Sequence, residues 1–156
     1  MSKAGRIKHA LATLTLIAAF VTGASAQSAE KSPSEQTCAL MAALVDQGAA
    51  GGNDHMAQMA AWMPEPVRTQ MSHAFDKIGD KKWLRGDVFS TFAVPTYAEE
   101  YLVALETEGS GTIYIRLIYE QYDGAMRLIT FSAADLFKDS MKERPYMQPP
   151  APVDCK

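Results

Sequence analysis

The chain has 156 residues, of which 15 are Lys or Arg and 18 are Asp or Glu, giving a formal charge of -3 at pH 7, and 47% of its residues are hydrophobic. This length predicts one domain, and the hydrophobic share is too high for a disordered chain. No apolar run reaches the roughly 18 residues that suggest a membrane-spanning helix, and the weak negative charge argues against a nucleic-acid-binding protein.

Residues 1–26 have the three parts of an export signal. Three basic residues stand within 1–8, an apolar stretch (ALATLTLIAAFV) fills 10–21, and the small residues Ala-Ser-Ala precede the expected cleavage site. The apolar stretch is too short to cross a bilayer, which takes ~20 residues. We therefore expect cleavage after Ala26 and a periplasmic or secreted mature chain, residues 27–156.

Loss of this segment changes the charge of the protein. The mature chain has 130 residues, with 12 Lys or Arg against 18 Asp or Glu and a formal charge of -6, because the signal carries three basic residues and no acidic ones. Polyanions and anionic lipids repel such a chain. We expect a soluble exported protein with no membrane span in its mature form and no affinity for nucleic acid.

Cys38 and Cys155 are the only cysteines, and they stand near the two ends of the mature chain. In an exported protein an even number of cysteines predicts an intramolecular disulfide, which here would close a loop of 117 positions. The proline-rich tail, residues 145–156, favours an extended conformation that needs such an anchor. A redox or metal-binding thiol pair finds no C-x-x-C motif and no neighbouring His, and an intermolecular bridge is the remaining alternative.

Helical patterns fill the first half of the mature chain. Ser32-Pro33-Ser34-Glu35 combines a capping box with proline at the first helical position, and Gly48 is a natural stop. The glycine-rich stretch 48–54 is expected to be a loop, and not a phosphate-binding P-loop, because no Lys follows it and a helix precedes it. The expected helices cover residues 33–47, about 56–63 (capped by Asn53 or Asp54) and 67–78.

From Trp83 onward the hydrophobic period changes to two, which predicts an antiparallel sheet. Asp123-Gly124 is a two-residue hairpin signal that pairs Tyr119 with Leu128. A three-residue loop at 109–111 is expected to set Tyr101 opposite Tyr119, which gathers one continuous apolar face. The expected strands cover 83–94 (interrupted at Gly86-Asp87), 101–107, 112–121 and 125–132, and a short helix over 133–141 precedes the tail.

The second face of this sheet mixes polar and apolar side chains. A concave pocket with apolar walls and a few polar groups is typical of a small-ligand site. The alternative is a solvated surface on which Glu120 and Arg127 form a cross-strand pair. The candidate ligand-binding residues are Tyr114, Arg116, Ile118, Glu120, Arg127 and Phe131.

Other chemistry-bearing residues have plain structural interpretations. His73 and Asp76 are neighbours on one helix and could serve acid-base chemistry, but no nucleophile and no known catalytic or zinc motif accompanies them. Soft sulfur ligands could hold Cu(I) in an exported protein, whereas the same helical spacing is also that of a buried core stripe. We expect no catalytic residue, no metal and no cofactor, although three methionines share one helical face: Met56, Met59 and Met63.

The order of elements carries a family resemblance. Helix, short helix and helix precede strands that read YLVAL (101–105), IYIRL (113–117) and RLITF (127–131). This order resembles the small exported bacterial proteins of the NTF2-like, cystatin-like α+β superfamily, in which helices pack into the concavity of a curved sheet. The superfamily includes ketosteroid-isomerase-like and polyketide-cyclase-like enzymes, which place an acid, often with a second acid or a tyrosine, inside the cone. Residues of the right type here are Tyr114, Asp87 and His73.

These observations predict one α+β domain over residues 27–156, with helices on a curved antiparallel sheet of about four strands, a short C-terminal helix and a proline-rich tail held by Cys38–Cys155. The expected function is non-catalytic binding of a small ligand or a partner protein in the bacterial envelope. One alternative is an NTF2-like enzyme that acts on a small hydrophobic substrate by proton transfer. A second is periplasmic Cu(I) handling through the three methionines.

Overall fold

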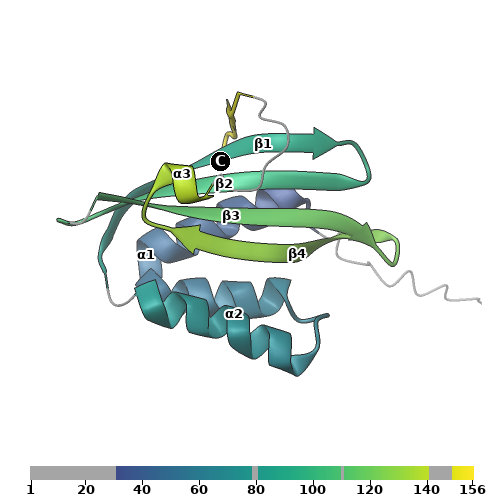
Figure 1. Cartoon of the computed structure of the whole chain (residues 1–156), viewed down its shortest axis with the longest axis horizontal. Coiled ribbons are helices and arrows are strands. Elements are labelled where there is room, and N and C mark those ends of the chain that lie inside the picture. The colour runs from purple at the N-terminus through teal and green to yellow at the C-terminus, as the bar shows by residue number, and fades with distance from the viewer. Residues whose placement is uncertain (1–30, 79–80, 110, 141–148) are drawn as a thin grey trace, which may run out of the picture. The chain divides into compact units, whose positions relative to one another are not determined.

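The computed structural model describes residues 31–78, 81–109, 111–140 and 149–156, so the expected export signal lies outside the described residues. Two helices come before the strands and a short third helix follows them, as the sequence predicts (Figure 1). None of the helices in these ranges has the length and hydrophobicity needed to cross a membrane. The helices are α1 (Pro33–Met59), α2 (Glu65–Ile78) and the short α3 (Phe137–Ser140).

One antiparallel sheet follows α2, which confirms the predicted α+β class. Its strand order is β4-β3-β2-β1-β5, and the tail supplies the fifth, two-residue strand. The expected interruption at Gly86-Asp87 is wrong, because the first strand runs through it and pairs with its neighbour on both sides. The strands are β1 (Trp83–Val94), β2 (Ala98–Thr107), β3 (Gly111–Tyr122), β4 (Ala125–Ala134) and β5 (Ala151–Pro152).

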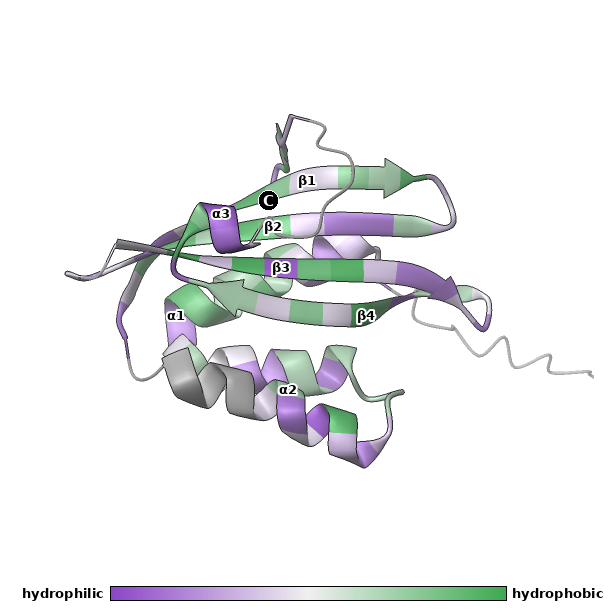
Figure 2. Ribbon diagram, viewed as in Figure 1, coloured by the Kyte–Doolittle hydropathy of each residue, from purple (hydrophilic) through white to green (hydrophobic). Residues whose placement is uncertain are grey.

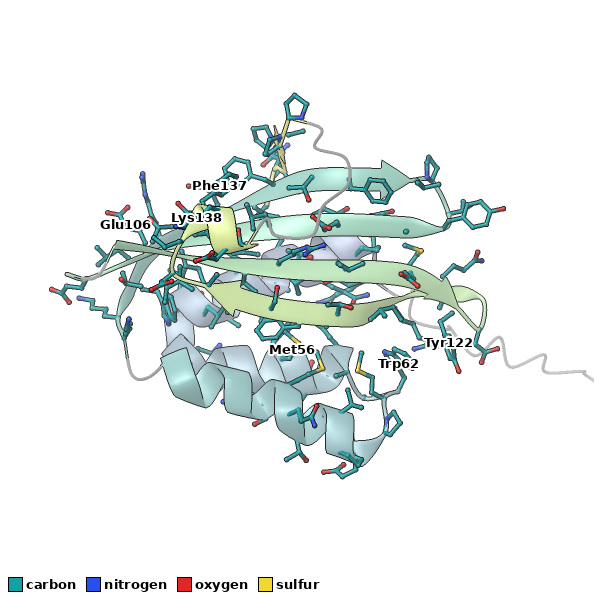
Figure 3. All side chains as sticks on the ribbon, in the orientation of Figure 1. Met56, Trp62, Glu106, Tyr122, Phe137 and Lys138 are labelled. Atoms are coloured by element: carbon teal, nitrogen blue, oxygen red, sulfur yellow. A yellow bond between two sulfur atoms is a disulfide. The ribbon has the colours of Figure 1, made fainter. Side chains whose placement is uncertain are left out.

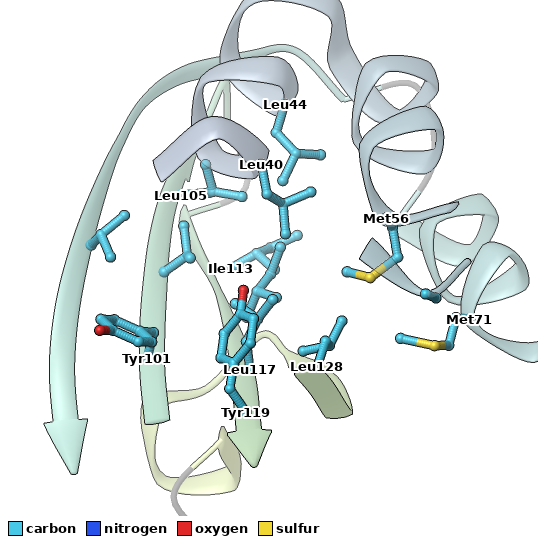
Figure 4. Close-up of a cluster of buried hydrophobic side chains, with 14 of the residues drawn as sticks. Leu40, Leu44, Met56, Met71, Tyr101, Leu105, Ile113, Leu117, Tyr119 and Leu128 are labelled. Atoms are coloured by element: carbon cyan, nitrogen blue, oxygen red, sulfur yellow. The ribbon is translucent and has the colours of Figure 1, made fainter. Parts of the chain in front are cut away.

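The helix α1 covers one face of the sheet, which we call the inner face (Figures 1 and 4). Alternate residues of β2 and β3 point into this contact, whereas the sheet as a whole mixes hydrophobic and hydrophilic residues along each strand (Figure 2). Leu40 and Leu44 of α1 meet them and are fully buried. The inner-face residues of the two strands are Tyr101, Val103, Leu105, Ile113, Ile115, Leu117 and Tyr119.

A sharp bend at Gly48 lets both halves of α1 reach the core. Gly48 has φ +70°, a conformation that favours glycine, and it ends the first half where the sequence predicts. In a straight helix Gln36 and His55 would lie ~28 Å apart. Here His55 Nε2 lies 3.3 Å from the carbonyl oxygen of Gln36, so the second half folds back beside the first.

The expected glycine-rich loop at 48–54 is wrong, because helical structure resumes directly after the bend. Gly51 and Gly52 are buried, and a Cβ on Gly51 would meet the Ala43 carbonyl oxygen at 2.8 Å. These glycines therefore permit close approach of the two halves of α1, a role that composition alone does not distinguish from a flexible loop. The expected separate helix near 56–63 is the end of α1, which stops at Met59.

One of the two predicted strand registers is confirmed and the other is wrong, because a hydrophobic pattern specifies which face a side chain takes but not which residue it pairs with. The β3–β4 pairing of Tyr119 with Leu128 is confirmed. The expected β2–β3 pairing is wrong by two residues, since Tyr101 lies opposite Leu117. A slip of two keeps every side chain on its face, so burial does not detect it, and the turn decides it. Thr107 pairs with Gly111, and its Oγ1 donates a hydrogen bond to the Gly111 carbonyl oxygen at 2.9 Å.

The disulfide between Cys38 and Cys155 is confirmed and joins α1 to the last residues of the chain. Residues 149–156, which we call the C-terminal strap, also contact the sheet through β5. Pro152 and Ala151 pair with Phe89 and Ser90, and the Val153 amide donates to the Val88 carbonyl oxygen at 2.9 Å. Closure of a 117-residue separation contributes up to ~4.7 kcal/mol in the chain-entropy account.

Gly86 offers a test of this packing. A Cβ at Gly86 would meet Met41 Cγ at 2.6 Å and Leu105 Cδ2 at 2.9 Å, and Leu105 is fully buried. We expect Gly86→Ala to lower the free energy of unfolding by about 1–3 kcal/mol in urea titrations, despite the better strand propensity of alanine. Asp87→Ala, one residue along and exposed, is the control and should change it by less than ~0.5 kcal/mol. A Gly86→Ala variant as stable as the parent would contradict the contact.

Candidate functional site

The six candidate residues do not all share the outer face, the face of the sheet opposite α1. A β-bulge between the Ile118 and Tyr119 pairs shifts the register of β4 by one residue. Phe131 therefore lies opposite Leu117 of the inner face and packs against the core. The expected face of Phe131 is wrong for this reason, because a bulge inverts every later side chain and leaves no clear signal in the sequence.

Tyr114 is partly covered by α3, which contacts β3 and β4 from the outer side (Figure 1). The rings of Tyr114 and Phe137 meet edge to face with their centroids 5.5 Å apart. The expected helix over 133–141 is shorter than predicted at its start, because β4 extends to Ala134. Phe137 and Lys138 mark this helix in Figure 3.

Arg116 lies in a buried ion pair with Glu100 on the outer face. Arg116 Nη2 is 3.0 Å from Glu100 Oε2, and the two side chains are 19% and 7% exposed. Thr91 Oγ1 donates to Glu100 Oε1 at 2.8 Å, so the carboxylate is held from two strands. The pair neutralises the arginine, which leaves Arg116 poorly suited to bind an anionic ligand.

Glu100 and Thr91 are missed by the sequence analysis because Glu99-Glu100 stands before the predicted start of its strand. The structure begins β2 at Ala98 and buries Glu100 between β1 and β3, where it is 5% exposed. A glutamate two residues before Leu102, with the same alternation, was the available signal. A solvated turn was the simpler interpretation of a two-glutamate sequence.

Arg127 and Tyr122 both contact the ring of Trp62, which lies between α1 and α2 in the sequence. The Arg127 guanidinium carbon lies 6.0 Å from the centre of the Trp62 ring, a cation–π arrangement. The Trp62 ring lies 4.9 Å from that of Tyr122 (Figure 3). Arg127 also stands opposite Glu120 in the β3–β4 ladder, as predicted.

The turn between β1 and β2, which carries Tyr97, lies beside the end of β3, which carries Tyr122. The Gln121 amide donates to the Tyr97 carbonyl oxygen at 2.9 Å, so the turn lies beside the β3–β4 hairpin. Tyr97 is 67% exposed and Tyr122 is 55% exposed. We call this set the loop-end surface, and it consists of Trp62, Val94, Tyr97, Tyr122 and Arg127.

Two hollows lie beside the C-terminal strap. The first, of about 430 Å³, is lined by α1 residues that include Cys38 and Ala42 and by the end of the strap. The second, of about 480 Å³, lies between Gly86–Phe89 of β1 and residues 152–155. None of the six candidate residues lines either hollow.

A hydrogen-bonded cluster of polar side chains lies on the inner face beneath the start of α1. Tyr119 OH is 2.9 Å from Thr37 Oγ1, which itself donates to the Pro33 carbonyl oxygen at 2.8 Å, and Tyr101 OH donates to Glu99 Oε2 at 2.6 Å. Burial raises the pKa of both tyrosines above the usual value, so both hydroxyls stay protonated. An acid beside a tyrosine is the kind of pair that the NTF2-like resemblance implies, but these residues line neither hollow.

The helical methionines belong to the core. Met56 and Met71 (Figure 4) are, like Met63, at most 9% exposed and pack in the same cluster as Leu128. Met59 is partly buried against this cluster. Within the described ranges no three His, Cys, Asp or Glu side chains are grouped to hold a metal ion. Met63 lies beyond the end of α1, so the three methionines do not share one helical face as expected, but packing against the core accounts for all three side chains.

The remaining predicted residues come from three different elements, α1, α2 and β1. Desolvation lowers the pKa of His55, opposed by its contact with the Gln36 carbonyl, so this histidine is held neutral. His73 and Asp76 fall on α2, but their side chains lie outside the described part of the structure. Asp87 is exposed on β1. A ligand-binding role for the six candidate residues stays a prediction.

Comparison with protein-family models, with curated proteins and with solved structures finds no match to this chain. Its function must therefore be argued from the geometry.

The buried pair of Glu100 and Arg116 predicts unequal effects for two glutamates of one strand. Glu100→Gln leaves the Arg116 charge uncompensated and should lower the free energy of unfolding by about 3–5 kcal/mol. Glu106 pairs with Arg85 at 2.7 Å, but the side chains are 46% and 75% exposed, so Glu106→Gln should cost less than ~1 kcal/mol. Urea titrations of both variants measure the two free energies of unfolding. Equal losses in the two variants would show that burial does not distinguish the pairs.

Proposed function

We propose that the protein is an exported, non-catalytic binding protein of the bacterial envelope, and that its loop-end surface contacts a partner protein. The observation that carries this proposal is the pair of exposed tyrosines, Tyr97 at 67% on the β1–β2 turn and Tyr122 at 55% at the end of β3, in segments joined by the hydrogen bond from the Gln121 amide to the Tyr97 carbonyl. Export, the disulfide and the composition of this surface each support it.

Two features support export, namely the signal-like N-terminal segment and the disulfide that holds the C-terminal strap. The basic head, apolar stretch and Ala-Ser-Ala site of residues 1–26 have the form of a cleavable signal. Disulfides form and persist in oxidising compartments such as the periplasm and are rare in the cytosol, so the Cys38–Cys155 bond fits the same destination. The mature protein would then begin at Gln27.

The loop-end surface has the composition of a binding hot spot. Tyr, Trp and Arg are the residues most enriched among those that dominate binding energy. Here the Trp62 ring contacts both the Tyr122 ring and the Arg127 guanidinium, so these side chains lose little freedom when a partner binds. The β1–β2 turn and the end of β3 hold the exposed rings at one end of a four-stranded ladder, which is a rigid support.

Contacts within the chain favour a partner protein over a small ligand on the outer face. Tyr114 packs on Phe137, Arg116 is paired with Glu100, and Phe131 has turned toward the core. The side chains predicted to line a pocket are thus largely committed to internal contacts. Helices packed on one face of an antiparallel sheet support the NTF2-like resemblance as a proposal about the fold family, without a catalytic site.

In-cell photo-crosslinking tests the proposal. A photo-reactive residue at position 97 of the full chain should form a specific adduct with one envelope protein. The intact mass of the exported product should equal that of a chain that begins at Gln27. The same residue at Asp46, exposed on α1, is the matched control and should form no such adduct. Tyr122→Ser should reduce the adduct at 97 by about thirtyfold, because a hot-spot residue contributes ~2 kcal/mol or more, while the thermal midpoint stays unchanged.

Absence of a specific adduct at position 97, or equal adducts at 97 and 46, would refute the loop-end surface as the binding site. A product that retains residues 1–26 would refute export with cleavage, separately from the surface.

A further inference from the structure

We propose that the Cys38–Cys155 disulfide is a site of thiol–disulfide exchange in the folded protein, and that exchange with a dithiol releases the C-terminal strap from the edge of β1. The inference rests on the two hollows beside the strap and does not depend on the loop-end surface.

The disulfide lies where solvent can approach it. Both cysteines are partly exposed, unlike the fully buried Leu40 two residues from Cys38. The hollow of about 430 Å³ is lined by both cysteines, and the hollow of about 480 Å³ on the other side of the strap is lined by Cys155 as well. Cys155 therefore borders both hollows, which give an attacking thiolate a path toward the disulfide in the folded protein.

Charge at the first hollow does not oppose a thiolate. Two lysines and two acids line it, namely Lys31, Lys156, Glu35 and Asp154. Lys156 Nζ lies 2.9 Å from Asp154 Oδ2, and Glu35 accepts hydrogen bonds from Ser32 in the capping box. The charges balance in number, so an anionic nucleophile meets no net repulsion at the sulfur.

The exchange balances with a dithiol as the reductant. Its thiolate attacks Cys155 Sγ, a new S–S bond forms to that sulfur, and the Cys38–Cys155 bond breaks as Cys38 leaves as a thiolate and takes up a proton. The second thiol of the reductant then attacks the mixed disulfide, which releases Cys155 as a thiol. The reductant is oxidised to its disulfide, and two electrons pass to the chain.

Apart from the disulfide, the strap is held by Val153 and Cys155, which pack partly buried against the core, and by a short pairing with the edge of β1. The described sheet contacts of the strap are two residue pairs and the Val153 amide bond to Val88, and Pro152 has no N–H to add a ladder bond. The core of α1, β2 and β3 contains no strap residue among its fully buried side chains. Reduction would therefore uncover the β1 edge at Val88–Ser90 and leave that core assembled.

The test is the rate at which dithiothreitol reduces the oxidised full mature chain, followed by alkylation and intact mass. We expect the rate to rise in proportion to dithiol concentration and to stay unchanged in urea well below the unfolding transition. Ala42→Trp fills the first hollow and should slow reduction about tenfold, with Ala42→Leu intermediate, since exchange rates depend on access to the sulfur. Ala50→Trp, exposed on α1 and outside both hollows, is the control and should reduce as fast as the parent.

A rate that saturates at the global unfolding rate and climbs steeply with urea would overturn the proposal, because the bond would then be reached only through unfolding. Equal rates for Ala42→Trp and Ala50→Trp would overturn the route through the hollow. Loss of far-UV circular dichroism on reduction would show that the disulfide holds the whole fold and not the strap alone.

Discussion

Burial of the inner sheet face under the two halves of α1 is the constraint on which the rest of the structure depends. Seven alternating residues of β2 and β3 make this face, and Tyr119 is fully buried beneath the start of the helix. One straight helix would cover only part of it. The left-handed Gly48 allows a single chain segment to cross the face and then fold back, so that Leu40 and Met56 reach the same core from the two halves.

The outer face follows from that arrangement. With α1 on the inner side, polar residues of β2 and β3 must either face water or pair with each other. The structure pairs Arg116 with Glu100 and leaves the exposed aromatic side chains Tyr97 and Tyr122 at one end of the sheet. In many proteins the binding residues lie in loops and strand ends that a rigid sheet positions, and the proposed partner surface has this form.

Much of the fold could be predicted because its signals are local. The capping box at Ser32, the Asp123-Gly124 hairpin and the pair of cysteines each specify a geometry through neighbouring atoms or a single bond, and all three are confirmed. Gly51 failed as a loop signal, because its need for close approach arises only from the packing of the two halves of α1. The β2–β3 register failed because a two-residue slip conserves burial.

The candidate site was less predictable for related reasons. Phe131 changed face through one bulge, and Glu100 became buried because its strand begins earlier than its hydrophobic pattern. The Trp62–Tyr122–Arg127 contact joins residues 60 to 65 positions apart in the sequence, which no local pattern brings together. Long-range packing thus decides the site, whereas local chemistry decides most of the elements.

Amide hydrogen exchange on the oxidised protein tests most directly whether the inner face is the stable unit and the strap an attachment to it. The account predicts that amides of β2 and β3, such as those of Val103 and Ile115, exchange only through global unfolding. The Val153 amide, held by one bond to Val88, should exchange at least about a hundredfold faster through local opening. A Val153 amide as protected as that of Val103 would contradict the account, because the strap would then belong to the core.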